Sequence, residues 1–302
     1  MFRHAIAILF LLISTAAHGA HQVKFVAEVA VEGPQRVAPD QNGNLYVTTR
    51  EGAVAVYTLD GKNVLTIRGN DPSGDPLLKK PAGIAVQGDT VYVCDTSLDR
   101  VVIFSRGGGY RDSFGEGGSG PKQLSNPSGI FVYQGVIYVA DYGNDRIQVF
   151  GPNGVYLQSI GRTGEGEALL KSPTDVAVDN RGNVYAVDGE SRQVKVYRQD
   201  GTYAGKISGP DKPFSLAMAG DGLFVADVDN YNITKYGFNG EKIFSFGTLG
   251  DDKVQFKEIA GISADRFGRV YAVDREKKSV QVIGTDKGEG GDLPLSVAPP
   301  TA

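Results

Sequence analysis

The sequence predicts an all-β protein, a six-bladed β-propeller built from four-stranded antiparallel blades. Three observations lead to this prediction. Short apolar runs alternate with tight polar turns, one pattern recurs about every 46 residues, and a strand near the amino end matches a piece missing from the last copy. Repeats of roughly 40–50 residues with four short strands each are typical of propellers.

The clearest copy of the repeat is residues 127–161. Its four apolar runs are rich in Val, Ile, Tyr and Phe, and they are residues 129–133, 136–140, 146–150 and 155–160. Turns that contain Gly, Asn or Pro separate them, as expected for strands joined by hairpins. We name the four strands of each copy a to d in chain order. Such a sheet buries both faces only when another copy packs on each side, so the copies must form an array.

Six copies share an apolar-aromatic-apolar-small pattern in strand b, usually followed by Asp. The six segments are residues 45–49, 91–95, 137–141, 184–188, 223–227 and 270–274. Their starts lie 46, 46, 47, 39 and 47 residues apart. No copy has a stretch of 3.6-residue periodicity, which excludes helical repeats of similar length.

The two ends of the array complement each other. The sixth copy finishes strand c at Ile283 and lacks strand d, whereas residues 23–31 form a strand without a repeat of its own. We expect this strand to complete the last blade and close the ring, which removes exposed sheet edges. The propeller is therefore assigned to residues 21–284. Residues 285–302 are rich in Gly, Pro and Asp and are expected to form a disordered tail.

Residues 1–20 have the layout of a signal peptide. Arg3 precedes an apolar run at residues 5–13, which is too short to span a bilayer, and small residues follow it. We expect cleavage between Ala17 and Ala20, and export to the bacterial periplasm or exterior, with eukaryotic secretion as the alternative. No later segment is long and apolar enough to span a membrane. We expect a monomer.

Charge and cysteine usage narrow the function classes. Loss of residues 1–20 removes Arg3 and no acidic residue, so the net charge changes from −4 to −5. An acidic balance does not favour nucleic acid as a partner. Cys94 is the only cysteine, so there is no internal disulfide, and we interpret it as a small buried hydrophobic residue.

The third copy resembles the NHL repeat. It has Asp141, Asn144, Arg146, Gln148 and Phe150 at the positions of that family's pattern. Copies 2 and 4 follow the pattern well, copies 1, 5 and 6 less so, and the resemblance covers about residues 23–284. It implies a six-bladed propeller. The family includes ligand-binding scaffolds, RNA binders and a few lyases, so it implies no single function.

In a closed ring, the b–c turns and the connections between blades share one face, around the end of the central channel. We call this the mouth face. Its b–c turns are residues 50–53, 96–100, 142–146, 189–193, 228–232 and 275–279, and its connections are residues 70–80, 116–126, 162–172, 210–212 and 248–258. Propeller ligands usually bind there.

Histidine is confined to His4, His18 and His21, before the first strand. A His-ligated metal, the family's peptide-amidating lyase chemistry and a Ser-His or Cys-His nucleophile pair are therefore disfavoured. Asp227, Asp229 and Asn230 are the nearest calcium motif, but the Gly and Glu of an EF-hand loop are missing. An axial calcium or other divalent metal held by carboxylates of several blades stays open. No helix follows the glycine-rich residues 115–120, which we interpret as a flexible connection and not a phosphate cradle.

Acidic and basic residues recur around the b–c turns. We interpret them as exposed structural braces of these turns, each pair contributing about 0–1 kcal/mol, although a catalytic role is the alternative. The braces are Asp95, Arg100, Asp141, Arg146, Asp188, Asp227 and Asp274.

Departures from the repeat point to a ligand site. At the start of strand a, four copies have Gly83, Gly129, Ser215 and Gly261. Copies 1 and 4, which lie opposite each other in a ring of six, have Arg36 and Asp175 there instead. We expect these charges to face each other across the channel mouth. The predicted ligand-binding residues are Arg36, Asp175, Tyr142, Asp229, Asn230 and Tyr231. Alternatively, Arg36 and Asp175 only satisfy buried polar groups.

The leading hypothesis is a non-enzymatic exported scaffold that binds a protein, peptide or glycan on the mouth face without a cofactor. The alternative is a propeller hydrolase or lyase that uses an axial divalent metal. RNA binding conflicts with export and with the acidic balance.

Overall fold

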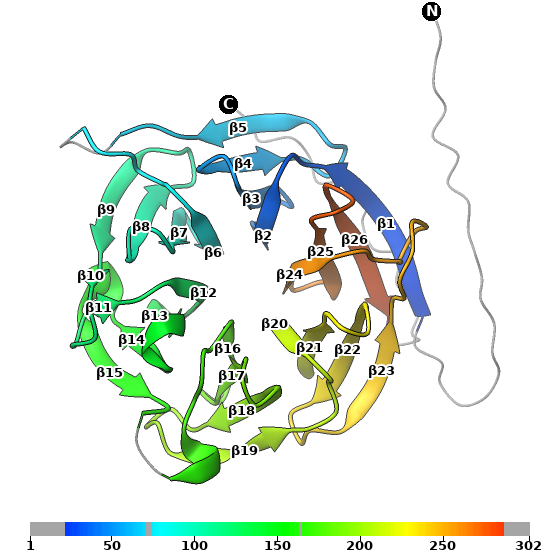
Figure 1. Cartoon of the computed structure of the whole chain (residues 1–302). Coiled ribbons are helices and arrows are strands. Elements are labelled where there is room, and N and C mark those ends of the chain that lie inside the picture. Colours follow the sequence, from blue (N-terminus) through cyan, green and yellow to red (C-terminus); the bar gives the residue numbers. More distant parts are fainter. Residues whose placement is uncertain (1–21, 71–73, 163–164, 287–302) are drawn as a thin grey trace, which may run out of the picture.

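The computed structural model describes residues 22–70, 74–162 and 165–286. Six four-stranded antiparallel sheets stand around a central axis, and the inner strands β2, β6, β12, β16, β20 and β24 surround that axis (Figure 1). The fold is therefore the predicted six-bladed β-propeller. No helix in the described part of the chain is both long and apolar enough to cross a membrane.

In blades 1 to 5, strands a to d follow in chain order from the axis outward. Blade 1 has β2 (Pro34–Pro39), β3 (Leu45–Thr49), β4 (Ala53–Tyr57) and β5 (Asn63–Ile67). Blade 2 has β6 (Pro81–Gln87), β7 (Thr90–Asp95), β8 (Arg100–Ser105) and β9 (Tyr110–Phe114). Blade 3 has β12 (Pro127–Tyr133), β13 (Val136–Asp141), β14 (Arg146–Phe150) and β15 (Tyr156–Ile160).

The second half of the ring repeats this order. Blade 4 has β16 (Val176–Val178), β17 (Val184–Asp188), β18 (Gln193–Tyr197) and β19 (Tyr203–Ile207). Blade 5 has β20 (Pro213–Ala219), β21 (Gly222–Asp227), β22 (Asn232–Gly237) and β23 (Lys242–Phe246). Blade 6 has β24 (Ile259–Ala264), β25 (Arg269–Asp274) and β26 (Ser279–Asp286). A short parallel pair, β10 (Glu116–Gly117) and β11 (Gln123–Leu124), lies in the connection into blade 3.

The amino-terminal strand closes the ring, as predicted. Strand β1 (Gln22–Ala30) pairs antiparallel with β26 and becomes strand d of blade 6, so the first and last strands lie side by side (Figure 1). Strand β26 continues past Ile283 to Asp286. The predicted signal peptide (residues 1–20) and residues 287–302 of the predicted tail lie outside the described residues.

Hydrophobic clusters lie between neighbouring blades. Each of six clusters combines buried Val, Ile, Leu, Tyr or Phe side chains of two adjacent blades, including the pair formed by blades 6 and 1. Because strand side chains alternate between the two faces of a sheet, each blade contributes to two clusters. A blade without neighbours would leave both apolar faces in water, so burial stabilises the ring and not the single sheet.

Candidate functional site: the mouth face and the channel

One buried carboxylate in each of blades 2 to 6 organises the mouth face. The aspartate that ends strand b accepts hydrogen bonds from main-chain N–H groups of the connection leading into its own blade. In blades 2, 4, 5 and 6 it also accepts from an N–H group of the b–c turn. These residues are Asp95, Asp141, Asp188, Asp227 and Asp274, each at most 3% exposed. Hydrogen bonds to a charged group contribute about 1.5–3 kcal/mol, so the carboxylates fix turns and connections together.

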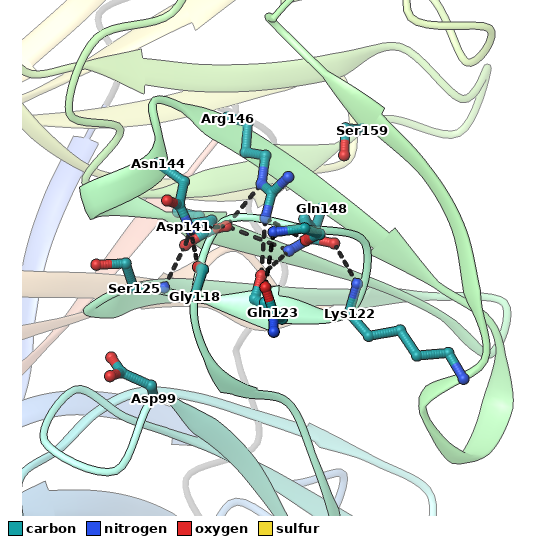
Figure 2. A network of polar contacts seen from close by, with 12 residues as sticks. Asp99, Gly118, Lys122, Gln123, Ser125, Asp141, Asn144, Arg146, Gln148 and Ser159 are labelled. Atoms are coloured by element: carbon teal, nitrogen blue, oxygen red, sulfur yellow. Dashed lines mark hydrogen bonds and ion pairs between the residues drawn. The ribbon is translucent and has the colours of Figure 1, made fainter.

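Asp141 has the most extensive of these networks. It accepts from Nε of Arg146 at 2.7 Å, from the side-chain amide of Asn144 at 2.9 Å and from the main-chain N–H of Ser125 at 2.7 Å. Arg146 also donates to the carbonyl oxygen of Gln123 at 2.7 Å. Figure 2 shows these groups converging from β13, β14 and the connection into blade 3.

The expectation of exposed charge pairs is wrong for Asp141 and Arg146, whose side chains are 0% and 4% exposed. The connection folds over the b–c turn and excludes water from the pair. In blade 4, Lys195 pairs with Asp188 at 2.7 Å, although the repeat pattern predicts no such partner. In blade 2, Arg100 donates to carbonyl oxygens of the connection. Removing one partner of a buried pair costs about 3–5 kcal/mol, far more than an exposed brace would contribute.

Arg36 and Asp175 meet across the axis. Nη1 of Arg36 lies 3.2 Å from Oδ2 of Asp175, and each side chain is 11% exposed. Nη2 of Arg36 donates to the carbonyl oxygen of Thr174 at 3.2 Å, and the guanidinium lies 4.8 Å from the ring centre of Phe214. Burial lowers the pKa of Arg36, and the charge of Asp175 opposes that shift.

Asp175 has further partners within blades 4 and 5. Its Oδ2 accepts from Oγ of Ser215 at 2.7 Å and from the N–H of Leu216 at 3.0 Å, and its Oδ1 accepts from the N–H of Val176. Ser215 in turn accepts from the N–H of Ile262 in blade 6. This chain of hydrogen bonds links three successive blades around the axis.

Glycine at the start of strand a in blades 2, 3 and 6 leaves room for the Arg36–Asp175 pair and for neighbouring main chain. We call the ring of residues at this level of the six inner strands the axial layer. A Cβ at Gly261 would lie 2.5 Å from Cδ of Arg36, and a Cβ at Gly129 would lie 2.4 Å from Oδ1 of Asp175. At Gly83 it would lie 2.6 Å from the carbonyl oxygen of Ser128. The Gly and Ser residues at these positions therefore make room for the one charged pair.

A cavity of about 250 Å³ extends along the axis from the Arg36–Asp175 pair. Its lining follows the inner strands from Arg36 and Asp175 toward their carboxyl ends and is mainly aliphatic. Strand a runs away from the mouth face, so the cavity lies on the side of the a–b and c–d turns, which we call the rear face. The Arg36–Asp175 pair closes the cavity toward the mouth face. The sequence places the two charges on opposite sides of the axis but does not show that they touch.

The other predicted ligand residues lie on the mouth face away from the axial cavity. Tyr142 is 43% exposed on the b–c turn of blade 3. Asp229 pairs with Lys212 at 3.1 Å, and Asn230 donates to Asp227. Tyr231 ends the same turn with a φ of 52°. The structure thus brings Arg36 and Asp175 together and places Tyr142 and the residue 229–231 turn on the surrounding rim.

Few potential metal ligands lie close together in the part of the chain that the structure describes. Within residues 22–70, 74–162 and 165–286, no group of three or more His, Cys, Asp or Glu side chains is placed to hold a metal ion. Asp175 is the one carboxylate in the described lining of the axial cavity, and it is already paired with Arg36. Cys94 is fully buried, and its pKa is raised by burial and by the nearby charge of Asp175.

A family model described as a 6-bladed beta-propeller matches residues 122–276, more than half of the chain. Among solved structures, the chain is similar to a catalytically inactive virginiamycin B lyase from Staphylococcus aureus with quinupristin. The TM-score is 0.62 and the identity 13%, over 88% of this chain and 99% of that chain.

Two further solved structures are also similar to the chain. One is a nidogen/laminin complex, with a TM-score of 0.57 and 19% identity over 70% of this chain and 79% of that chain. The other is a protein of unknown function from Bacteroides thetaiotaomicron, with a TM-score of 0.65 and 14% identity over 88% of this chain and 76% of that chain. At such identities the similarity shows the fold alone.

Proposed function

The chain belongs to the family of six-bladed β-propellers, and from that premise we propose that it is an exported, non-enzymatic scaffold that binds a macromolecular partner on its mouth face. The partner is a protein, peptide or glycan. On this proposal the repeats are of the NHL type. The aspartate at the end of strand b is their shared structural element, and the network of Asp141, Asn144, Arg146 and Gln148 in blade 3 is its fullest form.

The observation that carries the proposal is the fixation of the mouth face by buried carboxylates. Turns and connections that are held by charged hydrogen bonds lose little conformational entropy when a partner binds. The Arg36–Asp175 pair adds a closed centre to this face, so a partner meets a continuous surface and not an open tunnel. A rigid, wide and closed surface suits a large partner better than a small substrate.

Exposed residues on the rim are the proposed contacts. Tyr142 presents an aromatic side chain, and Asp229, Asn230 and Tyr231 present a charged and polar turn two blades away. Exposed tyrosines combine apolar area with a hydrogen-bonding group, which makes them frequent contributors to binding energy. Under this proposal Arg36 and Asp175 act on binding indirectly, by keeping the centre of the face closed.

The lyase alternative lacks a specific observation in its favour. One structurally similar protein is a histidine-to-alanine variant of virginiamycin B lyase that is described as catalytically inactive. The three histidines of the present sequence are His4, His18 and His21, which precede the first strand. Nidogen, by contrast, is a propeller neighbour seen in complex with another protein, laminin.

Affinity capture with matched variants tests the proposal. Purified protein is used to recover partners from a periplasmic extract, and the same extract is offered to Tyr142→Ser, Asp229→Lys and Phe267→Ser. Phe267 is 41% exposed on an a–b turn of the rear face, so its variant controls for a lost surface aromatic. We expect the first two variants to lose the recovered partner and Phe267→Ser to retain it. Turnover of a lactone or ester with no partner recovered would overturn the proposal.

A further inference from the structure

The connection into blade 5 is shorter than its counterparts. Blades 2, 3, 4 and 6 are preceded by connections of 12 to 15 residues, whereas only residues 208–212 join β19 to β20 (Figure 1). Each long connection buries at least one large apolar side chain. These include Leu77, Leu124, Leu170 and Phe256, at most 5% exposed.

The blades hold these long connections in a recurring way, through the third residue of strand c. In blade 6, Gln281 donates to the carbonyl oxygen of Gln255 at 2.7 Å and accepts from the N–H of Val254 at 2.9 Å. In blade 3, Gln148 makes the same two hydrogen bonds to its own connection. Lys195 of blade 4 donates to a connection carbonyl. Strand c is therefore a docking position for a peptide main chain in three blades.

Blade 5 keeps polar side chains at this docking position but has no long connection to occupy it. Thr234 is the third residue of its strand c and Asn232 the first. Between this strand and the short connection lies a pocket of about 160 Å³. Its lining includes Gly209, Asp227, Asn232, Thr234, Tyr236 and Lys242.

The pocket has buried polar side chains. Asp227, Thr234 and Tyr236 are 3%, 6% and 3% exposed, and all three line it. A short connection alone does not require such a lining. Blade 1 is also preceded by a short connection, and its strand c has Ala53 and Ala55 at the first and third positions.

We propose that the pocket between residues 208–210 and strands β22 and β23 binds a short extended segment of a partner polypeptide. The segment takes the place that the long connections take in blades 3, 4 and 6. Its main-chain carbonyl groups accept hydrogen bonds from the side chains of Asn232 and Lys242. Its main-chain N–H groups donate to Oγ1 of Thr234, which itself donates to Oδ1 of Asn232 at 3.3 Å. This inference rests on the proposed scaffold function. It identifies the place at the rim of the mouth face where a polypeptide partner binds.

A polypeptide fits this pocket better than a glycan does. The equivalent positions of three blades bind main-chain carbonyl groups, and in two of them the same side chain also accepts a main-chain N–H. A volume of about 160 Å³ is of the size that admits one small side chain, since a cavity of about 150 Å³ admits benzene. The hydroxyl of Tyr236 reaches Gly209 and fills part of the space that Leu or Phe fills elsewhere, so a small side chain is favoured.

Fluorescence polarisation of two labelled peptides tests this inference. The probes copy residues 119–126 and 252–258, the segments that blades 3 and 6 hold. The full chain is compared with Ser208→Trp, which places bulk on the exposed rim of the pocket, and with Thr234→Gln, which installs the amide of Gln148 and Gln281. Asn63→Trp adds the same bulk to an exposed position of β5 and is the control.

We expect the wild-type protein to bind a probe, Ser208→Trp to weaken that binding at least about tenfold, Thr234→Gln to strengthen it, and Asn63→Trp to leave it unchanged. Absence of binding at millimolar probe, or binding that is insensitive to both pocket variants, would overturn the inference. Displacement of the probe by simple saccharides at lower concentration than by unlabelled peptide would also overturn it, in favour of a glycan. If the partner captured through Tyr142 is retained by Ser208→Trp, the scaffold function stands while this pocket is not its peptide site.

Discussion

Replacement of Asp175 by alanine tests whether the channel is closed by a charged pair. The substitution leaves Arg36 buried without its counter-ion and removes the acceptor for Ser215 and Leu216. Loss of one partner of a buried pair costs about 3–5 kcal/mol, and we expect Asp175→Ala to lower the free energy of unfolding by that amount.

The opposite substitution should be milder. In Arg36→Leu, Asp175 keeps three donors, from Ser215, Leu216 and Val176, so its charge stays solvated by hydrogen bonds. We expect a loss of about 1–3 kcal/mol. The double variant has neither charge, so no unpaired guanidinium is buried. Its loss of free energy of unfolding should therefore be smaller than the sum of the losses of the two single variants.

Guanidinium unfolding followed by circular dichroism gives the three free energies, from which the coupling energy follows. The chain has no tryptophan, so far-ultraviolet dichroism is the practical signal. The reasoning is refuted if Arg36→Leu costs more than Asp175→Ala, or if the single costs add to within about 0.5 kcal/mol in the double variant.

Three further predictions concern the same core and rim. Gly129→Ala should destabilise by about 1–3 kcal/mol, because its Cβ meets main-chain and side-chain atoms of Asp175, whereas Gly220→Ala, which meets nothing within 4 Å, should be neutral or slightly stabilising in the same unfolding assay. Cys94 should resist iodoacetamide at pH 8 in the native protein and react fully in denaturant, because burial raises its thiol pKa; rapid native alkylation would contradict this. Burial raises the pKa of Asp145, but hydrogen bonds from Ser172 and Lys171 outweigh it, so the folded pKa lies below the ordinary value. A lowered carboxyl pKa contributes stability above its ordinary value that is lost as the pH falls, so Asp145→Asn should cost up to about 1 kcal/mol at pH 7 and nothing near pH 2, as unfolding at both pH values will show.

Blade number, strand order and ring closure follow from the sequence because they depend on local patterns. Most turns of each copy contain Gly, Asn or Pro, and most strands are rich in β-branched and aromatic residues, so local preference and global fold agree. The orphan strand β1 could be assigned because the last copy lacks one strand. The sequence also shows that Arg36 and Asp175 lie on opposite sides of the axis, because blades 1 and 4 face each other in a ring of six.

Contacts between non-equivalent parts of the repeat could not be predicted. Burial of Asp141 and Arg146 depends on how the connection folds over the b–c turn, and connections vary in sequence from blade to blade. In blade 4 the position of Arg146 is occupied by Gln193. Lys195, two positions further along strand c, pairs with Asp188 instead, because the side chains of alternate strand residues share a face. The pocket in blade 5 arises from a missing segment, and its only sequence signal is the 39-residue spacing between copies 4 and 5.

On the proposed function, a partner binds the rigid mouth face and not the axial cavity. Hydrogen–deuterium exchange of the full chain, alone and with the partner recovered by affinity capture, tests it most directly. Slower exchange in the b–c turns and connections, centred on residues 142–146 and 228–232, is the predicted result. Slower exchange confined to the cavity-lining residues 37–39 and 84–86, or to the rear-face turns, would contradict the claim.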